Sequence, residues 1–119
     1  MLPEKHWIAV DFDGTLVENT WAPGQPFVPG RVGRPIALMV NRVTQWLAQG
    51  KDVRILTARI ASTNTNAHYN KLIIERWCEK HFGQILVVTS EKDQYMTELW
   101  DDRAIQLIPD TGVRVDGRN

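Results

Sequence analysis

Residues 7–16 constrain the fold of this chain more than any other stretch, because a short apolar run ends there in two aspartates. The run 8–10 (Ile-Ala-Val) leads directly into Asp11, and Asp13 follows just before Gly14. This pattern indicates a buried strand that delivers two carboxylates to its C-terminal end, where a glycine lets the backbone turn away sharply. In an open α/β sheet, ligands bind at that end of the strands. The stretch therefore predicts a functional site at the carboxyl edge of a parallel sheet.

Two simpler interpretations of this stretch fit less well. Asp13-Gly14 is also typical of a hairpin turn, but the apolar run that follows is short and dissolves at residues 18–19 (Glu-Asn). Asp11 and Asp13 also have the spacing that opens a calcium-binding loop. Such a loop needs an acid at its twelfth position, where this chain has Ala22.

Composition indicates one ordinary soluble domain that spans residues 1–119. Hydrophobic residues make up 43% of the chain and charged residues 24%, and the net charge is zero. Zero net charge excludes a global field that would attract nucleic acid or an anionic membrane, so nucleic acid is expected only as a substrate. No apolar run reaches membrane-spanning length and no signal-peptide pattern precedes the first strand. The single Cys78 has no partner for an internal disulfide, so we expect a cytoplasmic protein without a membrane partner.

The rest of the chain alternates between strand and helix patterns. Apolar residues at helical spacing follow Pro35 and end before Gly50, and a second helical pattern ends before Gly83. Four short apolar runs are typical of strands: 53–56, 85–88, 96–100 and 104–108. This alternation predicts an α/β fold with a mainly parallel, Rossmann-like sheet and right-handed crossovers. We expect a three-layer α/β/α sandwich with the first strand at its centre.

Two segments carry no regular pattern. Residues 17–34 contain three prolines and three glycines, which predicts an irregular loop that lies over the end of the first strand. Trp21 and Phe27 in this loop either cover the edge of the core or stack on a ligand. The polar residues 110–119 are expected to fray.

Polar side chains follow each of the later strands as well. Thr57 ends the second strand, Lys92 follows the third, and Asp101-Asp102 follow the fourth. Parallel strands bring these groups to one sheet edge beside the first two aspartates. Four carboxylates at one edge repel each other unless a cation joins them, and oxygen ligands without His or Cys favour Mg²⁺. A magnesium ion beside a carboxylate, a lysine and a hydroxyl is typical of phosphoryl transfer.

These groups occur in the order of four known motifs. Residues 11–16 (Asp-Phe-Asp-Gly-Thr-Leu) resemble the first motif of the haloacid dehalogenase (HAD) superfamily of aspartate-nucleophile phosphohydrolases, and residues 55–59 (Ile-Leu-Thr-Ala-Arg) resemble the second. Lys92 falls where the lysine of the third motif belongs, and Asp101-Asp102 resemble the acidic fourth. The resemblance covers residues 7–108.

The resemblance implies a HAD-like fold and a role for each motif residue. Asp11 would be the nucleophile and a metal ligand, and Asp13 would be the general acid/base, with its backbone carbonyl at the metal. Asp101 and Asp102 would complete the Mg²⁺ site, and which of them coordinates directly is left open.

It also implies how a phosphoryl group is held. Thr57 would bind phosphoryl oxygens, and Lys92 would neutralise the negative charge of Asp11 and the phosphoryl group. The alternatives are that Thr57 simply ends a strand and that Lys92 is a solvent-exposed loop cation. The implied substrate-binding residues are Gly14, Thr15, Ala58 and Arg59, and Arg59 could equally bind an acid on the protein surface.

The gaps between the motifs leave no room for the cap domain that many members of the superfamily carry. The resemblance therefore implies a capless phosphatase whose substrate is a nucleotide, a phosphorylated polynucleotide end or another phosphomonoester. A second subunit of a homo-oligomer could complete such an open site. The alternatives are a non-catalytic module that binds metal or phosphate, and a phospho-acceptor domain.

Overall fold

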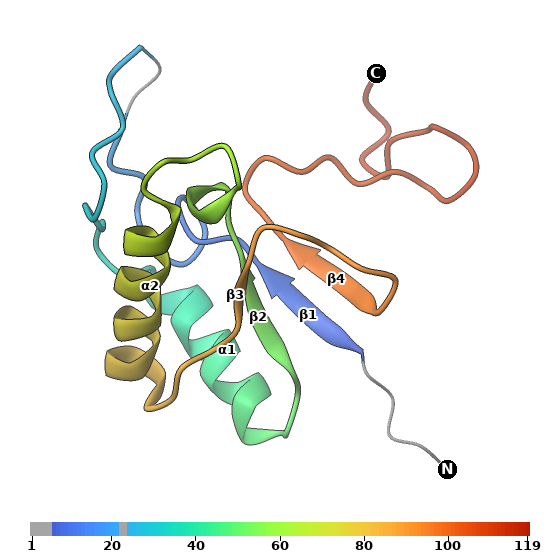
Figure 1. Cartoon of the computed structure of the whole chain (residues 1–119). Helices are drawn as coiled ribbons and strands as arrows, with labels where there is room; N and C mark the ends of the chain where they lie inside the picture. The colour runs from blue at the N-terminus through green and yellow to red at the C-terminus, as the bar shows by residue number, and fades with distance from the viewer. Residues whose placement is uncertain (1–5, 22–23) are drawn as a thin grey trace.

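The computed structural model describes residues 6–21 and 24–119, which form a four-stranded parallel sheet and two helices (Figure 1). In chain order the elements are β1 (Trp7–Val10), α1 (Ala37–Ala48), β2 (Val53–Leu56), the 3₁₀ helix η1 (Ala58–Ile60), α2 (Ala67–Phe82), β3 (Val88–Thr89) and β4 (Met96–Trp100). The strand order is β3-β2-β1-β4, and every pair is parallel. The predicted α/β class, the parallel sheet and the central position of β1 are confirmed.

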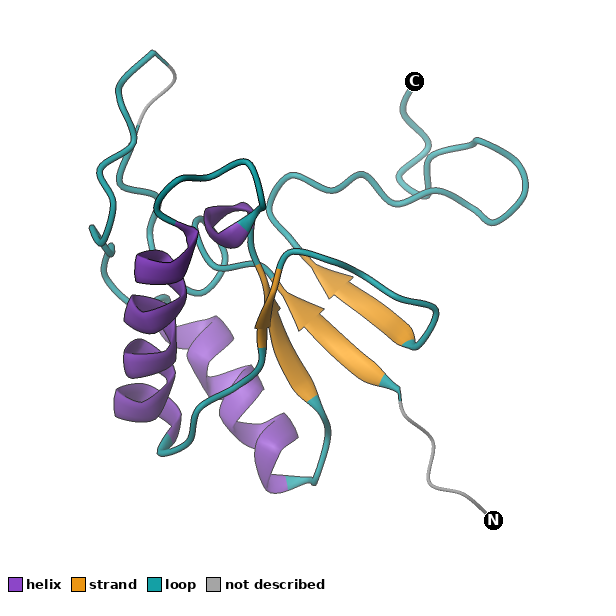
Figure 2. Cartoon of the chain, viewed as in Figure 1, coloured by secondary structure: helices purple, strands orange, loops and turns teal. Residues whose placement is uncertain are grey.

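Both helices cover the same face of the sheet (Figure 2). Ile8 and Val10 of β1 and Val53 of β2 share one buried cluster with Met39 of α1 and Ile74 of α2. Right-handed crossovers that proceed in one direction, from β1 to β2 to β3, place both helices on one side. The connection from β3 to β4 has no helix among its described residues. The described chain therefore has two layers, and the predicted three-layer sandwich is wrong on this point.

The helix ends follow the predicted stops. Gly50, just after α1, and Gly83, which caps α2, both have positive φ, at 78° and 73°, as the left-handed end of a helix requires. In α2 the buried residues are Asn70, Ile74, Trp77 and Cys78. Tyr69, which the apolar pattern alone would place in the core, is half exposed and packs against Gly30 of the loop 17–34.

The C-terminal quarter departs most from its sequence pattern. Of the apolar run 85–88, only its last residue joins β3. The edge strand predicted at 104–108 is wrong, because Leu107 forms only an isolated antiparallel bridge with Arg114 in its own segment. Figure 1 shows this segment leaving the sheet beyond β4. In the part of the chain that is described, no helix is long and apolar enough to cross a membrane.

Candidate functional site

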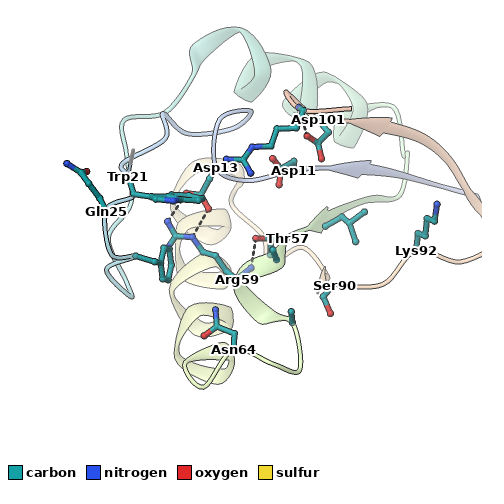
Figure 3. Close-up of a pocket in the computed structure, with 15 residues that line it drawn as sticks. Asp11, Asp13, Trp21, Gln25, Thr57, Arg59, Asn64, Ser90, Lys92 and Asp101 are labelled. Atoms are coloured by element: carbon teal, nitrogen blue, oxygen red, sulfur yellow. Dashed lines mark hydrogen bonds and ion pairs between the residues drawn. The ribbon is translucent and has the colours of Figure 1, made fainter. Parts of the chain in front are cut away.

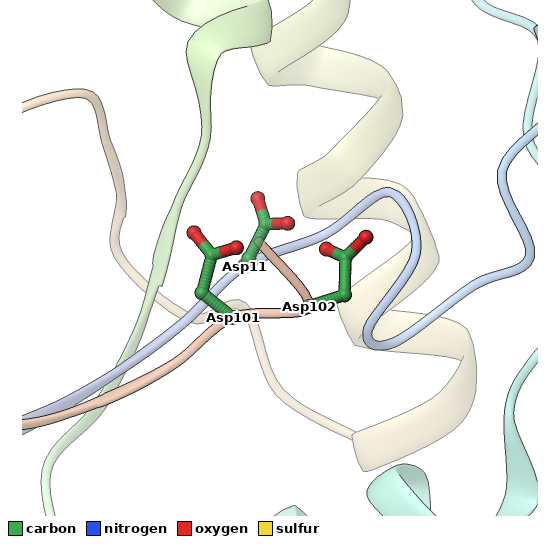
Figure 4. Close-up of side chains that lie close together, drawn as sticks. All are labelled: Asp11, Asp101 and Asp102. Atoms are coloured by element: carbon green, nitrogen blue, oxygen red, sulfur yellow. The ribbon is translucent and has the colours of Figure 1, made fainter. Parts of the chain in front are cut away.

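Three carboxylates meet where β1 and β4 end (Figure 4). Asp11 directly follows β1, and Asp101-Asp102 directly follow β4, its parallel neighbour. One oxygen of each residue lies within 4.8 Å of the corresponding oxygens of the other two. The convergence predicted for these three residues is therefore present.

A β-bulge sets the register that aligns them. Trp7 lies opposite Met96, yet Ile8 lies opposite Glu98, so Thr97 is an extra residue of β4 with no partner in β1. The Thr97 hydroxyl donates a hydrogen bond of 3.3 Å to the carbonyl oxygen of Trp7 at this point. Without the bulge, every later residue of β1 would face one position earlier in β4, and Asp11 would lie opposite a tryptophan instead of the acid pair.

The crowding of these carboxylates changes how Asp11 holds its proton. The pKa of Asp11 is raised to about 7, first by partial burial, then by the negative charge of Asp101, and to a smaller extent by the hydrogen bond and charge of Asp102. The backbone N–H of Phe12 acts in the opposite direction. The cluster therefore favours a proton or a cation at neutral pH. Its donors are all hard carboxylate oxygens, which fit Mg²⁺.

Gly14 and Thr15 support Asp102. The Thr15 hydroxyl donates to Oδ1 of Asp102 at 3.3 Å and accepts from the Asp102 backbone N–H at 3.2 Å. Gly14 has φ +86°, and a Cβ built there would lie 2.5 Å from Oδ2 of Asp102. Neither residue lines the cavity described below. Thr15 therefore holds an acid of the cluster in position, and Gly14 leaves the space that this carboxylate occupies.

Asp13 is paired with Arg59 instead of joining the three carboxylates. Nε and Nη2 of Arg59 each donate a hydrogen bond of 2.7 Å to a different oxygen of Asp13. Arg59 is only 4% exposed, and Nη2 also donates to the carbonyl oxygen of Arg31 in the loop 17–34. Of the two roles left open for Arg59, the structure places it against an acid. The sequence signal for this pairing was the position of Arg59 two residues after Thr57, at the same sheet edge as Asp13.

Thr57 lies at the sheet edge as the strand pattern predicts, and Ala58, which the resemblance implied, lies beside it. Thr57 directly follows β2, is buried, and its Oγ1 accepts the backbone N–H of Arg59 at the start of η1. Both Thr57 and Ala58 line one cavity with Asp11 (Figure 3). A hydroxyl and a backbone turn therefore lie beside the carboxylate.

The positions of two cationic residues, Lys92 and Arg103, differ from those expected from the sequence. Lys92 is exposed and lines the cavity, and Figure 3 shows it on the far side from Asp13, apart from the carboxylates. Arg103, one residue after the acid pair, also lines the cavity, and its guanidinium lies 5.7 Å from the centre of the Trp21 ring. Sequence reasoning did not place Arg103 in the site, although its position next to Asp102 was the available signal.

The cavity has a volume of about 760 Å³ and runs from the sheet edge to the loop 17–34. It is lined by carboxylates, small polar groups, cations and aromatic rings: Asp11, Asp13, Trp21, Gln25, Phe27, Leu56, Thr57, Ala58, Arg59, Ala61, Asn64, Ser90, Lys92, Asp101 and Arg103. This size is typical of a site that encloses a whole small molecule.

Comparison of the chain with protein-family models, with curated proteins and with solved structures gives no match. The function therefore has to be inferred from the residues of the site.

Gly14→Ala should cost more stability than Gly24→Ala, its matched control. Both glycines have φ +86°, so each alanine should cost about 1 kcal/mol of unfolding free energy from backbone strain alone. Among the described residues, a Cβ built at Gly14 meets the Asp102 carboxylate within 4 Å, whereas one built at Gly24 meets nothing. We expect urea unfolding to show an extra loss of about 1–3 kcal/mol at Gly14, together with weaker Mg²⁺ binding in calorimetry. Equal losses for the two variants would contradict the close contact with Asp102.

The raised pKa of Asp11 predicts a pH-dependent stability of the metal-free protein. The folded state holds an extra proton between about pH 4 and pH 7, so this contribution to stability is present below pH 4 and is lost as the pH rises to 7. Asp11→Asn mimics the protonated side chain. Its melting temperature, measured in EDTA, should therefore rise relative to wild type across this range.

Asp116→Asn is the control for that measurement. Arg114 lowers the pKa of Asp116 below its usual value of 3.8 through a hydrogen bond, so the stability of this variant relative to wild type should fall only as the pH rises toward 4, and should stay level between pH 4 and pH 7. A melting-temperature difference between Asp11→Asn and wild type that does not change with pH would show that Asp11 is not crowded.

Proposed function

We propose that this protein is a magnesium-dependent phosphohydrolase that cleaves phosphomonoesters with Asp11 as its nucleophile. The observation that carries the proposal is the place of Asp11 at the end of the central strand, within 4.8 Å of two further carboxylates and open to a cavity. The order of its motifs, which resembles the HAD superfamily, supports the same chemistry.

Asp11, Asp101 and Asp102 are the residues that would hold Mg²⁺. When bound, the ion supplies positive charge that offsets the charges of the carboxylates and of the phosphoryl oxygens. Because these residues come from two strands held in register by the sheet, they are positioned before any ligand arrives.

The reaction needs two displacements at phosphorus. An oxygen of Asp11 attacks phosphorus, the bond from phosphorus to the ester oxygen breaks, and the leaving alcohol takes a proton from Asp13. A water molecule then attacks the aspartyl-phosphate and gives its proton back to Asp13, which releases inorganic phosphate and restores Asp11. Thr57 and Ala58 line the same cavity, and the Thr57 hydroxyl and the backbone at Ala58 would hold phosphoryl oxygens.

Arg59 is a positioning residue in this scheme. It holds both oxygens of Asp13 and is itself fixed by burial, by the Arg31 carbonyl and by the ring of Phe27, 4.8 Å away. Asp13 can exchange a proton with a substrate only when one of these hydrogen bonds opens. Arg59 therefore governs where Asp13 lies and when it is free.

One observation favours a second candidate, a phospho-acceptor domain. Because Arg59 occupies both oxygens of Asp13, a phosphorylated Asp11 would lack a free base beside it and would persist. Incubation with acetyl phosphate separates the two functions, since an acceptor accumulates a stable phosphoprotein and a phosphatase releases phosphate continuously.

Phosphate release from a panel of nucleotides, sugar phosphates and phosphorylated oligonucleotides, with Mg²⁺ or EDTA, tests the proposed function. We expect Mg²⁺-dependent turnover that is abolished in Asp11→Asn, because a neutral amide is a poor nucleophile. Circular dichroism of this variant should match wild type. Near-normal turnover by pure Asp11→Asn protein, or turnover in EDTA, would refute the assignment.

Arg59→Lys tests the positioning role through the leaving group. A poor leaving group such as an alkyl alcohol needs the proton of Asp13, whereas p-nitrophenolate does not. We expect kcat/KM, which reports formation of the aspartyl-phosphate, to fall about 10²-fold for an alkyl phosphate and by only a few-fold for p-nitrophenyl phosphate. If KM instead rises equally for both substrates, Arg59 binds the phosphate directly. Asp13→Asn is the matched comparison and should show the same dependence on the leaving group.

A further inference from the structure

The cavity is much larger than the phosphate chemistry requires. Asp11 and Asp101 line the end of the cavity at the sheet, which we call its sheet end. Trp21, a residue of the loop 17–34, lines the other end, which we call its loop end (Figure 3). The volume of about 760 Å³ is in the range that encloses a complete organic ligand. The cavity therefore has room at its loop end for the part of a substrate beyond its phosphate.

The loop end is aromatic, and its rings are not part of the protein core. Trp21 and Phe27 pack edge to face, with ring centres 5.8 Å apart and planes at 84°. Neither belongs to the buried core cluster or to the partly buried residues packed against it, and both line the cavity. Of the two roles considered for these rings, core cover does not fit. Two half-buried aromatic rings on a cavity wall are a surface for stacking a flat ring.

Cations border the two rings, and a polar side chain lines another part of the cavity. Arg103 lies over Trp21 and Arg59 over Phe27, so positive charge borders both rings. Asn64 lines the same cavity, where its Oδ1 accepts the backbone N–H of Asn66 and its amide NH₂ adds a hydrogen-bond donor. A ligand that fits combines an anionic group, a flat ring and polar atoms on the ring edge.

We propose that this cavity binds a phosphomonoester that carries a nucleobase, with the phosphate at Asp11 and the base against Trp21. The inference rests on the proposed function for the phosphate end and adds the class of substrate. The same chemistry is present in a free nucleotide and in the phosphorylated end of a single strand. A net charge of zero gives no global field that would attract a long polyanion, so we take a single nucleotide as the recognised unit.

The test compares adenosine 5′-monophosphate with ribose 5-phosphate, which lacks only the base. With wild-type protein and Mg²⁺, kcat/KM for the nucleotide should exceed that for the sugar phosphate by about tenfold to a hundredfold, the usual effect of stacking one base. In Trp21→Ala this ratio should fall toward one. Trp21→Phe, which keeps a ring, should retain most of the preference.

Tyr95→Ala is the matched control, because Tyr95 is an exposed aromatic residue of the β3–β4 connection that does not line the cavity. Its ratio should equal that of wild type. A 5′-phosphorylated dinucleotide and tetranucleotide separate the two sources of the base. Rates equal to that of the mononucleotide assign recognition to one base, and rates that rise with length overturn the single-nucleotide claim.

Calorimetry on Asp11→Asn protein with the same two ligands measures the base subsite without turnover. Tighter binding of the nucleotide than of the sugar phosphate supports the base subsite, provided that this difference is lost in the Asp11→Asn, Trp21→Ala double variant. If wild type hydrolyses nothing but shows this difference, only the proposed function fails. Equal affinity for the two ligands, or no binding of either, overturns the inference. Efficient hydrolysis of both phosphates at equal kcat/KM also overturns it and leaves the phosphohydrolase intact.

Discussion

The parallel pairing of β1 with β4 is the constraint on which the rest of the site depends. It joins Asp11 to Asp101, ninety positions later in the chain, and the backbone N–H of Asp11 donates to the carbonyl oxygen of Trp100 at 2.9 Å. The bulge at Thr97 advances the register by one residue, and this advance brings the acid pair to Asp11. A repulsive cluster is thereby held together by sheet hydrogen bonds that do not involve the carboxylates.

Charge is distributed unevenly around this edge. Asp13 has a complete partner in buried Arg59, whereas Asp11 has two negative neighbours and a raised pKa. An ion pair compensates the burial of one carboxylate, and the other remains in need of a cation. Two aspartates one residue apart thus acquire different environments, which is the usual physical basis for giving two carboxylates different chemical roles.

Local sequence patterns were sufficient for the elements and for part of the site. The helical spacing and the stops at Gly50 and Gly83 predicted α1 and α2, and the apolar runs predicted β1, β2 and β4. The edge that Asp11 and Asp101 share also followed from the sequence, because parallel strands present their carboxyl ends on one side. These features depend on short-range periodicity and on strand direction, which the residues themselves encode.

The tertiary structure alone decided the layers and the partners. The sequence pattern does not show that both crossovers proceed in one direction, which leaves the sheet with helices on one face. It also does not show that Thr15 holds Asp102, that Arg59 pairs with Asp13, or that Lys92 lies apart from the carboxylates. Each of these depends on the path of a loop or on a register shift of one residue. Such features are set by packing between distant segments, and a local pattern of residue types carries no record of them.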